Sequence, residues 1–191
     1  MKKILVLFTF LIASFFSTTS KSDSINDLDL EGVKLGESVF KYISKEQIND
    51  DQKKITSKYK SDRYKRVNYS KSYGYSGNLY DGLQFHYDKK GKIGAVMGAL
   101  NMTEKTIDQC IGRSLSILDD IKQKINLQIE GSPTKILNTN FSKTTISKLH
   151  LDDGVVDLRC SYPKEKKWSS SLKITLFSRD FQNWLKYEAY K

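Results

Sequence analysis

The chain contains only two cysteines, and the residue patterns around them place both on faces that a folded protein must bury. Apolar residues recur at helical spacing through TIDQCIGRSLSILDDI, residues 106–121, and Cys110 lies among them. In GVVDLRCSY, residues 154–162, apolar and polar residues alternate, which puts Cys160 on the apolar side of a strand. A helix and a sheet that bury these faces together bring the two sulfur atoms close. We therefore expect a Cys110–Cys160 disulfide.

Two other roles for the cysteines are open at this stage. Both could be buried free thiols, or one could be a nucleophile activated by a histidine, as in a hydrolase or thiol enzyme. The only histidines are His86 and His150, and each falls among the polar positions of its predicted strand. We expect both rings to point away from the cysteines, which favours the disulfide.

The N-terminal residues predict export. Lys2 and Lys3 precede an apolar run over residues 4–16, and small hydroxyl residues follow it, which is typical of a secretory signal peptide. The run is shorter than the ~20 residues that a membrane-spanning helix needs, although an uncleaved anchor is the alternative. We predict a signal peptide at 1–22 and a single domain at 23–191, periplasmic or secreted, with no transmembrane segment after cleavage. Such a compartment is oxidising, which also favours a disulfide.

The remaining pattern predicts an α+β fold with a mostly antiparallel sheet. One long amphipathic helix, about residues 103–126 with its N-cap at Asn101 or Thr103, packs this sheet, and shorter helices precede and follow the strands. The N-terminal helix begins in a stretch opened by Gly36 and continues after a capping box at Ser44 and Gln47. The predicted strands are an edge strand at 64–69, a hairpin at 79–100 that turns at 88–92, and strands at 144–151, 154–162 and 170–178.

Motifs for catalysis, metals and cofactors are not found. No three or four His, Cys, Asp or Glu residues stand at metal-ligand spacing, and neither a phosphate-binding loop nor a Gly-x-Ser-x-Gly elbow is present. The acidic pairs Asp50/Asp51, Asp119/Asp120 and Asp152/Asp153 are typical of solvent-facing helices and turns. We therefore predict no cofactor, metal or catalytic residue, and an enzyme is the less expected class.

The strongest functional feature is a basic, tyrosine-rich segment at residues 53–75 of a chain whose formal net charge is +10. Such a segment attracts anions, and its rings favour wet interfaces. Because export removes the chain from nucleic acid, we expect an envelope component instead: a protein, an anionic lipid or a glycan. A solvated edge whose lysines prevent aggregation is the alternative. The predicted anion-binding residues are Lys53, Lys54, Lys58, Lys60, Arg63, Lys65, Arg66 and Lys71.

Three segments carry a resemblance to a known group. LEGVKLGESVFKYISKEQI (30–48), YDGLQFHYDKKGKI (80–93) and FQNWLKYEAYK (181–191), with a cysteine in the intervening helix, resemble small exported proteins of Pelagibacter-type marine alphaproteobacteria. The resemblance implies a bacterial periplasmic location and no particular activity or ligand. Together these features predict a non-enzymatic periplasmic binding or accessory protein, with peripheral binding to an anionic envelope surface as the alternative.

Overall fold

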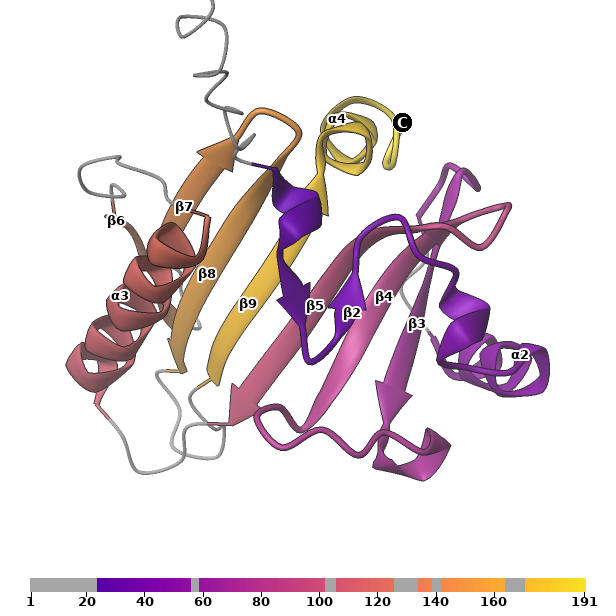
Figure 1. Cartoon of the computed structure of the whole chain (residues 1–191), viewed down its shortest axis with the longest axis horizontal. Helices are drawn as coiled ribbons and strands as arrows, with labels where there is room; N and C mark the ends of the chain where they lie inside the picture. The colour runs from indigo at the N-terminus through magenta and orange to yellow at the C-terminus, as the bar shows by residue number, and fades with distance from the viewer. Residues whose placement is uncertain (1–23, 56–58, 102–105, 126–133, 139–141, 164–170) are drawn as a thin grey trace, which may run out of the picture.

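The protein is built around one antiparallel sheet. The computed structural model describes residues 24–55, 59–101, 106–125, 134–138, 142–163 and 171–191 (Figure 1). Seven strands stand in the order β3-β4-β5-β9-β8-β7-β6, and every neighbouring pair is antiparallel. Helices flank the sheet, which confirms the predicted α+β class with an antiparallel sheet.

The sheet consists of two meanders that meet where β5 pairs with β9. All of the strands except β6 lie close to the predicted strands, since alternation and turn residues specify them. At the turn between β4 and β5, Gly91 has a φ of 83°, a left-handed conformation that favours glycine. The strands are β3 (Tyr64–Ser70), β4 (Gly82–Asp88), β5 (Ile93–Asn101), β6 (Thr134–Asn138), β7 (Ser142–Leu151), β8 (Gly154–Pro163) and β9 (Ser171–Ser178).

One face of the sheet, the helix face, carries the main core. The long helix α3 (Ile107–Lys124) packs on β7, β8 and β9, and the short hairpin of β1 (Asp29–Leu30) and β2 (Val33–Lys34) crosses β5 (Figure 1). Helix α2 (Lys45–Lys54) lies beside β3. The predicted long helix therefore covers only half of this face, because the N-terminal segment covers the other half.

Helix α3 begins later than the sequence suggested. Its N-cap is Thr106, whose hydroxyl accepts a hydrogen bond from the Gln109 amide while the Gln109 side chain accepts one from the Thr106 amide. The predicted cap at Asn101 is wrong because β5 continues through that residue. Residues 102–105, with the other predicted cap Thr103, lie outside the described residues.

The predicted disulfide is confirmed. Cys110 of α3 and Cys160 of β8 are bonded, with their Cα atoms 5.9 Å apart, and both side chains are buried with Leu172. Neither sulfur is therefore a thiolate, the form that a nucleophilic cysteine needs. In the chain, α3 lies between the two meanders. The disulfide ties this helix to β8, a central strand of the second meander.

Of the predictions for the N-terminal region, one is confirmed and one is wrong. The capping box of Ser44 and Gln47 is confirmed at the start of α2. The helical stretch expected after Gly36 is only a 3-10 turn, Val39–Lys41, because Gly36 and Ile93 are joined by a backbone hydrogen bond that holds the chain along β5. Strand β6 was not predicted.

The N-terminal prediction is untested by the structure. The signal peptide expected at residues 1–22 lies outside the described residues. Within the described part of the chain, none of the helices has the length and apolar character needed to cross a membrane.

We expect the disulfide to contribute strongly to stability. It closes a loop with a sequence separation of 50 residues, for which the loss of chain entropy in the unfolded state corresponds to about 4 kcal/mol. The double variant Cys110→Ala/Cys160→Ala should lose unfolding free energy of this order in urea titrations. Dithiothreitol should destabilise the wild type similarly and leave the double variant unchanged; equal stability of the oxidised and reduced wild type would contradict the prediction.

Candidate functional site

The second face of the sheet is only partly covered, and the uncovered part forms a groove. Helix α4 (Arg179–Tyr187) packs Phe181 and Trp184 against Ala95 and the partly buried Phe177. Beside α4 lies an open groove of about 450 Å³, lined by side chains of β4–β9, by α4 and by Tyr59. We call this groove the sheet groove and this side of the sheet the groove face.

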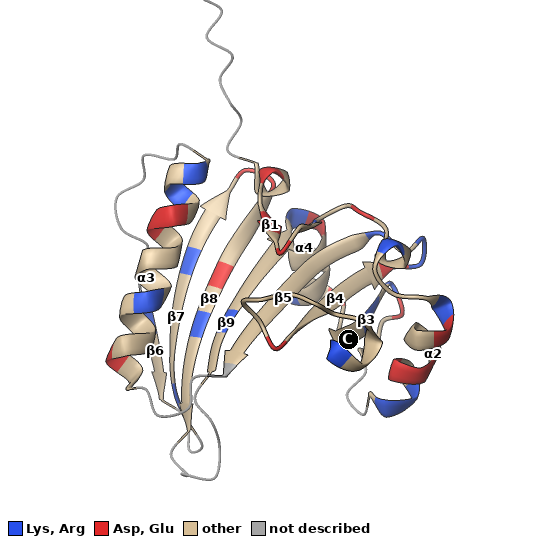
Figure 2. Cartoon of the chain, turned by 60° about the horizontal axis from the view of Figure 1, so that its bottom comes forward, with Lys and Arg blue, Asp and Glu red and all other residues tan. Residues whose placement is uncertain are grey.

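Strand alternation explains which residues line the sheet groove. On β8, Val156, Leu158 and Cys160 point to the helix face, so that Asp157 and Arg159 point to the groove. Antiparallel pairing then places Lys173 of β9 directly opposite Arg159. Lys and Arg positions on neighbouring strands β7, β8 and β9 form a band across the sheet (Figure 2).

A buried carboxylate, that of Asp157, contacts two of the cations in this band. Asp157 is only 1% exposed, and it accepts two hydrogen bonds from the Arg159 guanidinium, from Nε at 2.7 Å and from Nη2 at 3.1 Å. The Lys148 ammonium lies 3.5 Å from the same carboxylate. These hydrogen bonds raise the pKa of Arg159. Paired charges of this kind compensate the cost of burying an ion, whereas removal of one partner is strongly destabilising.

Lys173 has a different environment. None of the acidic side chains in the described ranges forms an ion pair with it, and its directly opposite neighbour is the cation Arg159. Like charges directly opposite one another in a sheet destabilise it. The groove therefore holds a cation whose directly opposite neighbour is a second cation.

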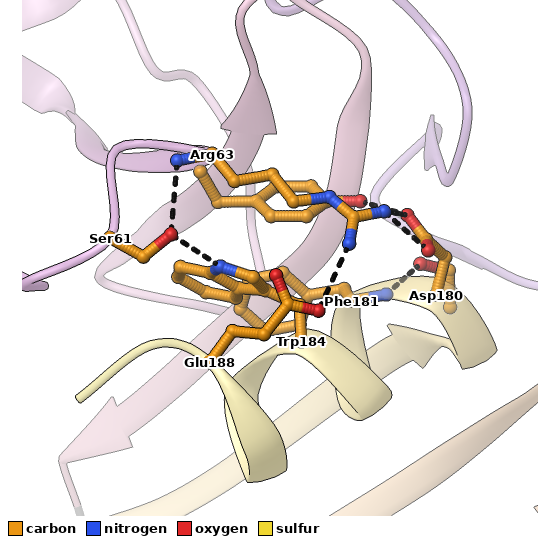
Figure 3. A network of polar contacts seen from close by, with 8 residues as sticks. Ser61, Arg63, Asp180, Phe181, Trp184 and Glu188 are labelled. Carbon is orange, nitrogen blue, oxygen red and sulfur yellow. Dashed lines mark hydrogen bonds and ion pairs between the residues drawn. The ribbon is translucent and has the colours of Figure 1, made fainter. Parts of the chain in front are cut away.

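The other end of the sheet groove is aromatic and is held by a polar network (Figure 3). Arg63 donates two hydrogen bonds to Asp180 at 2.6 and 2.8 Å and lies 3.5 Å from Glu188, and the Trp184 indole donates to the Ser61 hydroxyl at 3.0 Å. This network fastens the loop before β3 to α4. It seats Tyr59 at the groove end, where the Tyr59 ring lies 4.7 Å from that of Trp184.

The position of His86 corrects the sequence prediction. The ring lies on the face opposite the cysteines, as expected, but it is buried at 8% exposure because α4 covers this part of the face. Its Nδ1 is 2.9 Å from the Tyr59 hydroxyl. Burial, and secondarily the charge of Arg66, lowers the pKa of His86 to about 3. His150 is exposed on β7, as predicted.

The predicted anion-binding residues do not form one surface. Arg63 belongs to the network that holds α4, Lys53 pairs with Asp50 at 3.1 Å, and Lys54 donates to the Tyr73 hydroxyl. Lys65 and Arg66 alternate along β3 and therefore point to opposite faces. The remaining members are Lys60 and Lys71, whose side chains are exposed, and Lys58, which lies outside the described residues.

The groove cations Arg159 and Lys173 were missed by sequence reasoning. Their alternation with apolar residues is visible in the sequence, but it does not show that the two cations stand opposite one another. Among the residues that the structure describes, no group of three His, Cys, Asp or Glu side chains is arranged to hold a metal ion.

Comparison with models of protein families, with curated proteins and with solved structures finds no match. The resemblance to exported proteins of Pelagibacter-type bacteria therefore stays a prediction.

We predict that His86 makes folding pH-dependent. Its pKa is 6.5 when unfolded and about 3 when folded, so the unfolded chain takes up a proton that the folded chain excludes. Above pH 6.5 the ring is neutral in both states, so its burial costs no unfolding free energy. As the pH falls from 6.5 towards 3, protonation of the unfolded chain lowers the unfolding free energy. Between pH 7 and 5 the unfolding free energy should fall by about 2 kcal/mol. His86→Gln should flatten this slope in urea titrations, and the exposed control His150→Gln should keep it; a slope unchanged in His86→Gln would contradict the assignment.

Proposed function

We propose that the chain is an exported, non-enzymatic binding protein of the bacterial periplasm or exterior and that it holds a small ligand in the sheet groove. The observation that carries the proposal is the uneven covering of the sheet. The helix face is sealed by α3, the hairpin and α2, whereas the groove face leaves about 450 Å³ open beside α4. Ligand sites typically have volumes of about 300–1,000 Å³ and mostly apolar walls with a few polar groups.

The walls of the groove support this proposal. Met97, Ile146 and Leu185 contribute apolar surface, while Arg159 and Lys173 contribute donors. Both the disulfide below the sheet and the polar network at α4 hold these walls in place. A site held by rigid elements loses little conformational entropy when a ligand binds. The disulfide also supports the proposed oxidising location.

The neutral dye N-phenyl-1-naphthylamine, whose fluorescence rises in apolar surroundings, tests the proposal. We expect saturable binding by the protein with residues 1–22 removed. Ile146→Trp should abolish it, because the indole fills the middle of the groove. Ile136→Trp is the matched control, since Ile136 is 54% exposed and points to the other face.

Near-ultraviolet circular dichroism establishes that both variants are folded. Dye binding that is equal in Ile146→Trp and Ile136→Trp would show that the groove is not the site. If the wild type binds neither this dye nor any of the probes described below, the proposed function is contradicted.

A second candidate is peripheral binding to an anionic envelope surface. Lys60, Lys65 and Lys71 are exposed, and no acid in the described ranges pairs with them. For this candidate, vesicles rich in phosphatidylglycerol should bind the protein at low salt and release it at several hundred millimolar salt. The triple variant to Glu should lose binding, and the control Lys90→Glu/Lys143→Glu/Lys186→Glu should lose less. Binding that survives high salt, or that is equal in both variants, would contradict it.

A further inference from the structure

The groove face of β6–β9 carries a strong excess of positive charge. In its described part, four cations face the groove side and Asp157 is the one acid. Asp157 forms ion pairs with both Arg159 and Lys148, so its one negative charge is divided between two cations. The cations are Lys135, Lys148, Arg159 and Lys173.

The register concentrates this charge at one level of the sheet. Lys135 stands opposite Ile146, Ile146 opposite Arg159, and Arg159 opposite Lys173. Three of the four cations therefore lie in one cross-strand row. The planar Arg159 guanidinium has five N–H donors, of which the Asp157 pair uses two. An anion above this row would accept hydrogen bonds from Arg159 and Lys173 together.

Towards α4 the row is followed by the ion pair of Lys148 and Asp157, and the rest of the groove lining on both sides of the row is neutral. The hydroxyls of Thr144 and Ser161 line the groove on one side of the row. Towards α4, Met97, Phe177 and Leu185 line it, so the surface becomes apolar within a few residues of the cations. A purely ionic ligand would leave this apolar wall in water, and a purely apolar ligand would bury the cations without a partner.

We propose that the sheet groove binds a single-chain amphipathic anion, whose carboxylate lies between Arg159 and Lys173 and whose hydrocarbon chain runs towards Met97 and Leu185. This inference rests on the proposed function and specifies its ligand class. The charge of the row selects an anionic head, and the apolar wall selects a chain.

Isothermal titration calorimetry with four probes tests the inference. Octanoate has both the negative charge and the hydrocarbon chain. Octanol lacks the charge, octyltrimethylammonium has the opposite charge, and acetate lacks the chain. We expect octanoate to bind at least about tenfold more tightly than each of the other three, because a charge-assisted pair and the apolar contact both contribute.

Charge reversal at Lys173 separates binding from folding. Lys173→Glu places a carboxylate opposite Arg159, so the thermal unfolding temperature should be at least that of the wild type. Octanoate affinity should nevertheless fall at least about tenfold. The matched control Lys90→Glu makes the same change in an exposed turn and should bind octanoate as the wild type does.

The outcomes distinguish the two proposals. Octanol or octyltrimethylammonium binding as tightly as octanoate, or equal octanoate affinity in Lys173→Glu and Lys90→Glu, would overturn the anion inference. If the naphthylamine dye still binds in an Ile146-dependent manner, the groove remains a ligand site. Acetate binding as tightly as octanoate would also overturn the inference, since the chain would then contribute nothing.

Discussion

The bond between Cys110 and Cys160 is the constraint on which the arrangement of this protein depends. The two meanders are separate in sequence, and α3 is the helix that lies between them along the chain. By tying α3 to β8, the disulfide fixes this connection against the second meander, and Leu118 and Ile125 can then join the main core. A helix with one apolar stripe would otherwise depend on packing alone for its position.

The two faces of the sheet are closed by different means, and the difference produces the groove. On the helix face the cover is apolar and extends over both meanders. On the groove face the cover is the short helix α4, which hydrogen bonds from Arg63 to Asp180 and from Trp184 to Ser61 hold over β5, β8 and β9, and the groove lies open beside it. The strands beyond its reach expose polar side chains, as an antiparallel sheet with one solvated face does.

Sequence patterns predicted what local periodicity determines. The inward positions of Cys110 and Cys160, the turn at Gly91 and the capping box at Ser44 depend on neighbouring residues, and all were confirmed. His86 was misjudged because alternation separates two faces but does not say which becomes covered; its cover comes from Phe181, far along the chain. Asp180, which pairs with Arg63, is 117 residues away, so the basic segment could not reveal that partner.

The groove shows the same limit. Arg159 and Lys173 are directly opposed only through the register of β8 on β9, which no single strand contains. Residues 159 and 160 are adjacent on β8 and point to opposite faces, so the backbone that carries Cys160 also carries Arg159. The disulfide therefore anchors the backbone of β8 at the residue next to Arg159. The disulfide and the proposed ligand site thus share one strand, and an oxidising compartment would favour the bond that anchors it.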